Sequence, residues 1–413
     1  MRQKRTPSFS PIVEAEGSVT RLCDDRVMPF ADELIGVATA TTLERALSGA
    51  AGRPMPELAA ASAGFAPLSL RERSDVLRDA MLTDIGGNYD HLAATVRTAA
   101  TGALPFTGWL IWPVTSAVAQ KSVDDGSPAS FDDALALLAE LTPRLSSEFA
   151  IRTLLLADLD RALPIILEWT TSPDEHVRRL ASEGTRSFLP WARRVPALVA
   201  RPDATIPILD RLYRDESEYV RRSVANHLND FSRQHPDVVV ATAKSWLTAP
   251  DDHTGRLVRH ALRTVVKKGH PGALTLLGFD TDAELTVVGP TLDLDEVAFG
   301  ETITFSADIS NAGPTDAVLA IDYVVHHMKA NGSQTAKTFK LATRTLAPGE
   351  TISISRSHSL RAITTRRYYA GAHGIELQIN GASRGRADFA LLPAVPDGTA
   401  EPADVNEPAI LER

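Results

Sequence analysis

The sequence predicts a multidomain α-then-β protein, in which a HEAT-like α-helical solenoid is followed by an immunoglobulin-like β-sandwich. Two observations carry this prediction. First, an acidic turn followed by Val-Arg occurs three times, and the valines of the three copies are Val177, Val220 and Val258. They are 43 and then 38 residues apart, which is the spacing of stacked helix pairs. After Phe279 the apolar residues change from a helical period to the period of two that is typical of strands.

Helical patterning begins before the repeats. A helix is expected near Asp32 to Ser48, inside an Ala- and Pro-rich region, residues 1–70, that gives no chemical signal. A domain of HEAT-like helical repeats is expected over residues 71–282. Early in it an aromatic cluster contains Trp109 and Trp112, and we interpret this cluster as core packing because aromatic residues at helix spacing usually pack together.

The β-rich part is expected over residues 283–393. Turn signals such as Asn-Gly and Pro-Gly separate short alternating runs, which is the pattern of an immunoglobulin-like sandwich without a disulfide. The tail over residues 394–413 repeats Pro, Asp and Glu and is expected to be disordered. The seven expected strands lie at 285–288, 303–307, 318–325, 337–341, 351–355, 374–379 and 388–391.

Composition limits the classes of function. A chain of 413 residues that is 44% hydrophobic can form two or three cores. Its single cysteine, Cys23, excludes an internal disulfide and a cysteine-built zinc site, and we expect it to be inert. No run approaches the roughly 18 apolar residues of a membrane helix, and the start has no signal-peptide pattern, so a cytoplasmic location is expected. A monomer is expected as well. Adjacent His326 and His327 point to opposite sides of a strand, and no spaced set of metal ligands is found.

Charge is distributed unevenly along the chain. The formal net charge is −9, which argues against a simple nucleic-acid coat protein. Residues 141–279 nevertheless hold 20 Lys and Arg against 16 Asp and Glu, whereas the remainder holds 23 against 36. Positive charge concentrated in one segment is expected where one face of a protein meets a polyanion.

One stretch, residues 181–192, carries unusual chemistry. It places a carboxylate, Glu183, and an arginine, Arg186, three residues apart, followed by Pro190 and Trp191. We expect an active-site helix that presents the charged pair on one face and ends at Pro190. A surface ion pair followed by a core tryptophan is the alternative, because exposed ion pairs are common and contribute little to stability.

Three runs give the sequence a family likeness. Residues 183–192, 220–230 and 259–269 closely resemble the AlkC branch of the HEAT-like-repeat DNA glycosylases. The likeness covers about residues 72–280, and the following sandwich looks like the immunoglobulin-like domain found in part of that branch. Residues 1–70 depart from the family pattern, which leaves their role open.

The resemblance implies a DNA repair enzyme. Such an enzyme would hydrolyse the N-glycosidic bond of cationic alkylated bases, chiefly 3-methyladenine and 3-methylcytosine, in duplex DNA without flipping the base, and so start base excision repair. The family's catalytic residues map onto Glu148, Glu183, Trp191 and Asp230, and Asp230 is expected to orient the water. Since a cationic base leaves as a neutral molecule, carboxylates that stabilise positive charge on the sugar suit the reaction, and no metal or cofactor is required.

Further residues are expected at the DNA. The guanidinium of arginine matches the geometry of phosphate oxygens, and a basic helix face can follow the DNA backbone. An Arg-Arg-Tyr-Tyr loop in the sandwich can contact a groove of the DNA. Structural ion pairing, a solvated helix face and core tyrosines are the corresponding alternatives. The expected DNA-binding residues are Arg152, Arg186, His227, Arg259, Arg263, Lys267, Lys268, Arg366, Arg367 and Tyr368.

Two other functions fit parts of the sequence. A non-catalytic HEAT-repeat scaffold that binds DNA or a protein partner is the main alternative, although it predicts no special acids beside a basic face. A carbohydrate-active enzyme with an accessory sandwich would also combine carboxylates with tryptophans, but it would need export, for which no signal is expected.

Overall fold

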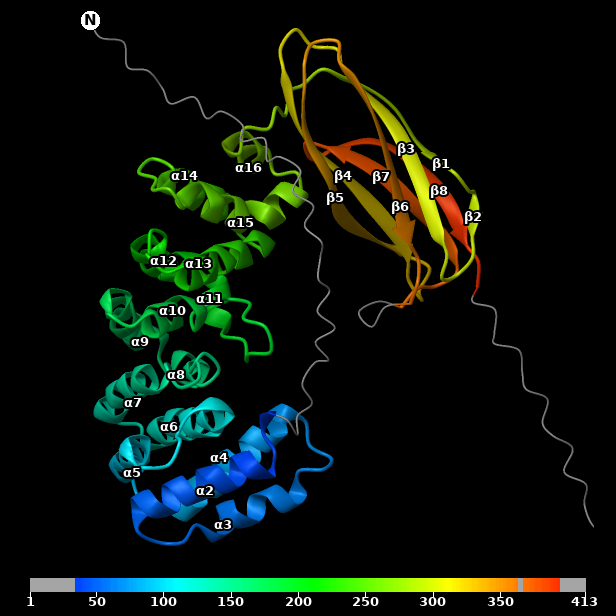
Figure 1. The fold of residues 1–413 in the computed structure, drawn as a ribbon. Helices are drawn as coiled ribbons and strands as arrows, with labels where there is room; N and C mark the ends of the chain where they lie inside the picture. The colour runs from blue at the N-terminus through cyan, green and yellow to red at the C-terminus, as the bar shows by residue number, and fades with distance from the viewer. Residues whose placement is uncertain (1–33, 363–366, 394–413) are drawn as a thin grey trace, which may run out of the picture.

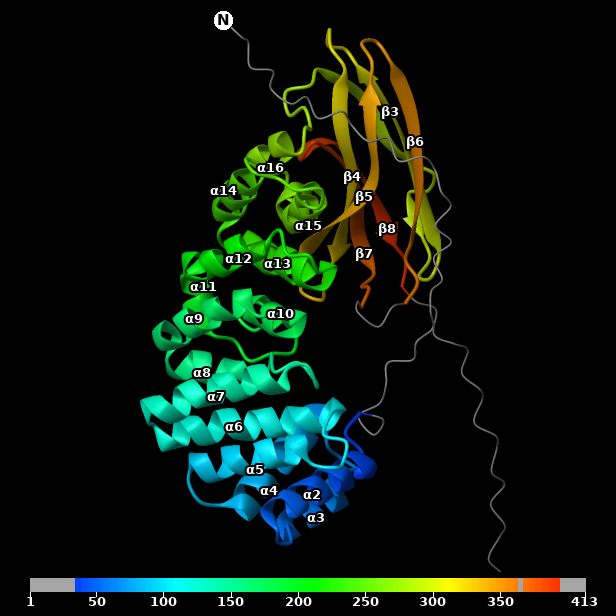
Figure 2. The same cartoon turned by 60° about the vertical axis from the view of Figure 1, so that its left-hand side comes forward.

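The protein consists of a curved column of helices with a β-sandwich beside one end of it (Figure 1; Figure 2). A computed structural model describes residues 34–362 and 367–393. Cys23, Arg366 and the acidic tail, on which expectations were placed above, lie outside these ranges. Within them, no helix is long and apolar enough to cross a membrane.

The helices share one continuous apolar core, which runs from Ile35 to Ala273. The two N-terminal helices belong to it, because Leu43, Leu47 and Leu58 are buried in the same cluster as the later helices. The α-helices are α2 (Val37–Ala51), α3 (Pro56–Ala60), α4 (Leu70–Ile85), α5 (Tyr89–Thr101), α6 (Ile111–Asp125), α7 (Pro128–Leu141), α8 (Ile151–Ala157), α9 (Leu159–Glu168), α10 (Glu175–Glu183), α11 (Pro196–Ala200), α12 (Ile206–Leu212), α13 (Glu218–Asp230), α14 (Pro236–Trp246), α15 (Thr254–Lys267) and α16 (Pro271–Leu276).

The recurring acidic turns start the helices that were expected to repeat. An Asp174 carboxylate oxygen accepts the backbone N–H of His176 at 2.7 Å before α10, and Asp215 accepts that of Ser217 at 2.9 Å before α13. Asp251 accepts the N–H of Thr254 at 2.7 Å before α15. The carboxylates of Asp174 and Asp251 satisfy donors in the first turn of the helix that follows, whereas that of Asp215 accepts from Ser217, the residue just before α13. An acidic turn therefore precedes each of α10, α13 and α15, and these helices pack side by side in that order (Figure 1).

The sandwich has two sheets, with strand order β1-β3-β6 in one and β2-β8-β7-β4-β5 in the other. Every expected strand is present, and β2 is added, a two-residue strand that pairs in parallel with β8. Burial alternates along β3, as the period-two pattern predicted. The strands are β1 (Leu285–Leu292), β2 (Glu296–Val297), β3 (Thr302–Asn311), β4 (Ala317–Met328), β5 (Gln334–Leu346), β6 (Thr351–Ser359), β7 (Gly371–Ile379) and β8 (Ala382–Leu391).

The two parts meet backbone to backbone just after α15. Gly269 and Gly381 both have positive φ, and a Cβ atom on Gly269 would lie 2.6 Å from the Gly381 Cα. The Asn380 amide donates to the carbonyl of Asp280 at 2.5 Å, which ties the turn after β7 to the connection between the two parts. This close approach requires glycine on both sides and places the sandwich beside α13 and α15 (Figure 2).

Candidate active site

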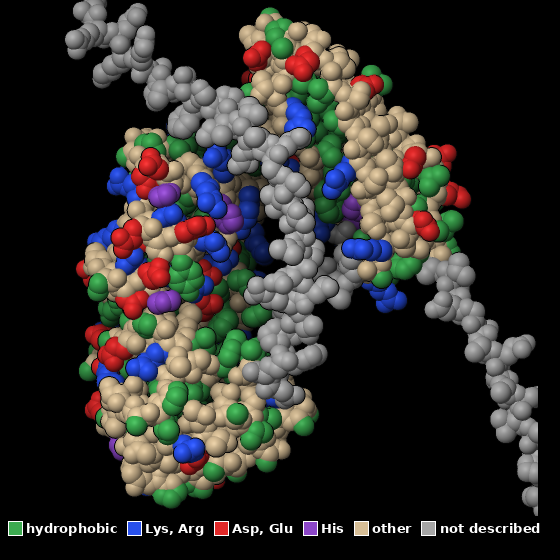
Figure 3. Space-filling model, viewed as in Figure 1, with side chains coloured by type: hydrophobic (Ala, Val, Ile, Leu, Met, Phe, Trp, Pro, Cys, Tyr) green, Lys and Arg blue, Asp and Glu red, His purple; other side chains and the backbone are tan. Residues whose placement is uncertain are grey.

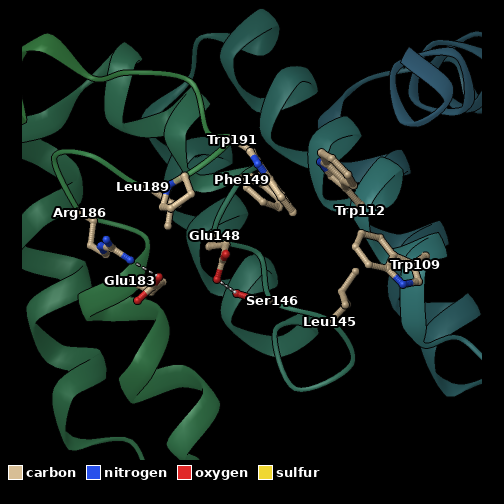
Figure 4. A pocket seen from close by; sticks show the side chains of 11 residues that line it. Trp109, Trp112, Leu145, Ser146, Glu148, Phe149, Glu183, Arg186, Leu189 and Trp191 are labelled. Carbon is tan, nitrogen blue, oxygen red and sulfur yellow. Dashed lines mark hydrogen bonds and ion pairs between the residues drawn. The ribbon is translucent and has the colours of Figure 1, made fainter. Parts of the chain in front are cut away.

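A cavity of about 320 Å³ opens where three segments of the helical column meet (Figure 4). The first segment is a 3₁₀ turn, Gly108–Leu110, and the start of α6; the second is the turn before α8; the third is the loop that follows α10. Three of the four residues expected to be catalytic line this cavity. Its lining residues are Trp109, Trp112, Leu145, Ser146, Glu148, Phe149, Glu183, Arg186, Leu189, Pro190 and Trp191.

Helix α10 ends at Glu183, so the expectation that it continues to Pro190 is wrong. The reason is Arg152, which is 1% exposed and reaches into the loop from α8. Its guanidinium donates to the carbonyl oxygens of Gly184 at 3.1 Å, Arg186 at 2.6 Å and Arg193 at 3.0 Å. A helix that continued to Pro190 would need the Gly184 carbonyl to accept the N–H of Phe188, which instead donates to Asp230 Oδ2 at 3.2 Å. Glu183 and Arg186 still pair, with Nη1 donating to Oε1 at 2.7 Å.

Trp191 stands out of the loop. Its side chain is 73% exposed, and its φ of 60° is in the left-handed region. Such a backbone costs a non-glycine residue about 1–3 kcal/mol and persists only where the surroundings hold it. Arg71, at the start of α4, donates a hydrogen bond to the Trp191 carbonyl, and Arg152 holds the loop from behind. Two arginines therefore maintain the position of Trp191.

The acids around the cavity alternate with arginines in a chain of ion pairs. Arg179 donates to Glu148 Oε2 at 2.7 Å and lies 3.6 Å from Glu183 Oε1. Arg186 bridges Glu183 and Asp230, with Nε donating to Asp230 Oδ2 at 2.9 Å. Burial works to lower the pKa of Arg186, but Asp230 and Glu183 outweigh it and raise that pKa above its ordinary value. The row of ion pairs contains three carboxylates and two guanidiniums, so together these five side chains carry one net negative charge.

Asp230 lies behind Arg186 and is not among the residues that line the cavity. Its two oxygens accept Arg186 Nε and Nη2, at 2.9 and 3.1 Å, and the backbone N–H of Phe188, at 3.2 Å. A carboxylate has about four accepting positions, so three are taken. In this conformation Asp230 holds Arg186 and the loop, and it has little capacity left for a water molecule.

Arg152 and His227 were expected to contact DNA, and the structure contradicts both expectations. All three described donor contacts of Arg152 go to backbone carbonyls, and burial lowers its pKa to about 10. His227 is 0% exposed, between Thr205 and the carbonyl of Ser182. Burial and the nearby Arg186 lower its pKa to about 3, so the ring is neutral at pH 7. Both residues support the core.

A second cavity, of about 530 Å³, lies between α13 and α15, and we call it the basic groove. Arg221, Arg222, Arg256, Arg259 and Arg263 line it together with a single acid, Glu218. Arg259 is exposed, whereas Arg263 is partly buried and donates to Asn226 at 3.1 Å. Lys and Arg side chains gather on this end of the column, toward the sandwich (Figure 3).

The remaining expected DNA contacts divide into exposed and packed residues. Lys267 and Lys268 are exposed at the end of α15, where Lys268 donates to the Ser232 carbonyl at 3.0 Å. Arg367 is exposed and lies over the Tyr369 ring, 5.5 Å from its centroid. Tyr368 differs from the expectation, because its ring packs edge-on against His327, 5.6 Å away, at the margin of the sandwich core. A core position explains Tyr368 better than a groove contact.

Comparison with known proteins agrees with this architecture. A family profile described as DNA alkylation repair enzyme matches residues 146–268, and one for the C-terminal Ig-like domain of uncharacterised protein YhaZ matches residues 286–393. The uncharacterized protein YhaZ of Bacillus subtilis (strain 168) is 38% identical over 262 residues, covering 63% of this chain and 72% of that protein. The structure of Pseudomonas fluorescens alkylpurine DNA glycosylase AlkC, bound to DNA containing an abasic site analog, is 34% identical with a TM-score of 0.76, covering 88% of this chain and 100% of that one.

The protein is therefore a DNA alkylation repair enzyme with a glycosylase fold. Its helices surround one cavity with acids and tryptophans, and an Ig-like domain follows them (Figure 1). The chain belongs to the AlkC family of these enzymes. The family likeness of the three sequence runs is confirmed.

Proposed function

We propose that the protein releases cationic alkylated bases, 3-methyladenine and 3-methylcytosine, from duplex DNA by hydrolysing the N-glycosidic bond. The observation that carries this proposal is the meeting of Glu148, Glu183 and Trp191 around one open cavity in an alkylation-repair fold. Because Trp191 is 73% exposed, this wall of the cavity can approach a base pair from outside. We therefore propose that the base is not turned into an enclosed pocket.

The chemistry of the lining residues favours a substrate that already carries positive charge. Among the described residues that line the cavity, those with titratable side chains are Glu148, Glu183 and Arg186. The nearby His227 is buried and neutral, so it is a poor proton donor. A neutral base needs protonation as it leaves, whereas an alkylated cationic base leaves as a neutral molecule. What the site supplies is negative charge beside the sugar, on which positive charge develops.

We assign the orientation of the attacking water to Glu148 instead of Asp230. Both described hydrogen bonds of the Glu148 carboxylate, from Ser146 at 2.8 Å and Arg179 at 2.7 Å, end on Oε2. Its other oxygen, Oε1, can therefore accept a hydrogen bond from water in the cavity. Glu183 adds negative charge at the other side, and Asp230 positions Arg186.

The basic groove is the proposed contact for the DNA backbone. Replacing Arg259 and Arg263 by glutamine should lower the slope of log affinity against log salt by up to about 1 for each phosphate that is no longer neutralised. Fluorescence anisotropy with an undamaged duplex over a range of salt concentrations measures this slope. The control is Arg161→Gln, because Arg161 pairs with Asp132 at 2.7 Å and lies outside the groove. An unchanged slope in the double variant would place the backbone contact elsewhere.

Release of free bases tests the proposed activity. The full chain is incubated with methylated duplex DNA, and the low-molecular-weight fraction is identified by mass spectrometry. We expect 3-methyladenine and 3-methylcytosine, and a large loss of both with Glu148→Gln. Salt-dependent binding without any released base would favour a non-catalytic scaffold.

A further inference from the structure

Two tryptophans that the sequence assigns to packing lie at the cavity. Trp109 is in the 3₁₀ turn and Trp112 is in the first turn of α6, three residues later, so both side chains reach the same side of the column. Both line the cavity, across from Glu183 and with Glu148 between (Figure 4). Their ring centroids are 6.0 Å apart, and Phe149 stacks on Trp112 at 4.9 Å.

We propose that Trp109, backed by Trp112, forms a second aromatic wall of the site, which contacts the alkylated base and selects it for its positive charge. This inference rests on the proposed function and adds the residues that determine its substrate class. The face of an indole ring attracts cations through its quadrupole, and tryptophan is the strongest of the aromatic side chains in this respect.

The acids alone cannot supply all of this selection. Glu148 is already paired with Arg179 at 2.7 Å, and Glu183 with Arg186 at 2.7 Å. A cation that enters the cavity must compete with these guanidiniums for either carboxylate. Trp109 has no such ion pair to break, so its face favours a cation over a neutral base at a smaller cost in desolvation. Trp112 is 8% exposed and already packs against Phe149 and Arg71, so it supports this wall from behind.

Arg71 shows that a cation fits against this wall. Its guanidinium carbon lies 5.8 Å from the centroid of the Trp112 ring, and the same guanidinium donates to the Trp191 carbonyl. One positive group thus spans from the aromatic wall to the loop that carries Trp191. Among the described residues no Lys or Arg side chain lies over the Trp109 ring, and Trp109 is partly exposed, so a ligand can approach its face.

The selectivity for charge is the quantity to measure. In the Glu148→Gln background, in which base release should be slow, affinity is compared for two duplexes that differ by one methyl group, 3-methylcytosine against cytosine. Because N3 methylation also disrupts the base pair, recognition of the cation is read from the change in the ratio of the two dissociation constants between variants. Because an unfolded fraction would weaken both affinities equally, the ratio is unaffected by a loss of stability.

Trp109→Leu should lower this ratio by about 3- to 30-fold, the range of a partly desolvated cation–π contact. Trp109→Phe keeps an aromatic face and should retain most of the selectivity. Because leucine and phenylalanine are both apolar, a difference between the two variants reports the aromatic face and not the filling of space. An unchanged ratio in Trp109→Leu, with a selective background enzyme, overturns the inference.

The failure of the proposed function would look different. If the wild-type chain releases no base from methylated DNA, the proposed activity is refuted whatever the ratio is. If the wild type releases cationic bases while the Glu148→Gln background binds both duplexes equally, only the inference about Trp109 and Trp112 is overturned.

Discussion

Glu148→Gln should release 3-methyladenine roughly 10²-fold more slowly than the wild type, the scale on which one electrostatic stabiliser of a transition state contributes. The substitution keeps the shape of the side chain and removes its charge from the wall of the cavity. The Glu148 side chain is 16% exposed, and its partners Ser146 and Arg179 can still donate to an amide oxygen. The unfolding free energy should therefore fall by only about 1–2 kcal/mol.

Single-turnover kinetics at saturating enzyme separates this effect from binding. The control is Glu140→Gln, since Glu140 also accepts from an arginine, Arg97, at 3.0 Å, but is half-exposed and outside the cavity. That variant should release bases at the wild-type rate. A Glu148→Gln enzyme with an unimpaired rate would remove Glu148 from the mechanism.

Asp230→Ala should lower the unfolding free energy by about 3–5 kcal/mol, the usual result of removing one partner of a buried ion pair. The side chains of Asp230 and Arg186 are each 9% exposed, and two hydrogen bonds join them. Removing the carboxylate also frees the loop at Phe188 and leaves Arg186 with Glu183 alone. We expect release of 3-methyladenine to slow on the order of 10²-fold, because displaced catalytic groups have effects of this size.

The repeat structure offers a matched control for this prediction. Asp215 binds Arg178 through two hydrogen bonds of 2.7 and 3.1 Å, with both side chains at most 9% exposed, and neither residue lines the cavity. Asp215→Ala should cost similar stability, measured by denaturant unfolding, yet leave the rate per folded molecule unchanged. Equal loss of activity in both variants would mean that Asp230 acts only through stability.

The order of the two parts follows from local patterning, which is why the sequence predicts it. The acidic turns before α10, α13 and α15 are local signals, since each is closed by hydrogen bonds between residues two or three apart. The alternation along β3 is also local, because it needs only one buried face. Strand β2 could not be found in this way. It has two residues, and its pairing with β8 brings together positions 94 residues apart, from Glu296 to Ala390.

The site depends more on tertiary contacts, and its prediction was correspondingly less complete. Arg152 and His227 have the residue types of DNA contacts, but their burial arises from packing against the loop after α10 and against Thr205. Trp109 has helix spacing that fits a core as well as a cavity wall. Arg179 and Arg178 are neighbours in a Val-Arg-Arg run, and no local pattern distinguishes them. In the structure Arg179 pairs with Glu148 at the cavity, whereas Arg178 pairs with Asp215 away from it.

The charge of the departing base is the central element of the mechanism, and one measurement tests it directly. Single-turnover release is compared for 3-methyladenine and for an uncharged isostere in which carbon replaces the ring nitrogen that carries the methyl group. Both duplexes are used at saturating enzyme, so differences in binding do not enter. The account predicts that 3-methyladenine is released and that the isostere stays attached to its sugar. The titratable side chains among the described lining residues, Glu148, Glu183 and Arg186, are held in ion pairs and are poor proton donors for a neutral leaving group. Release of the isostere at a rate similar to that of 3-methyladenine would contradict the account.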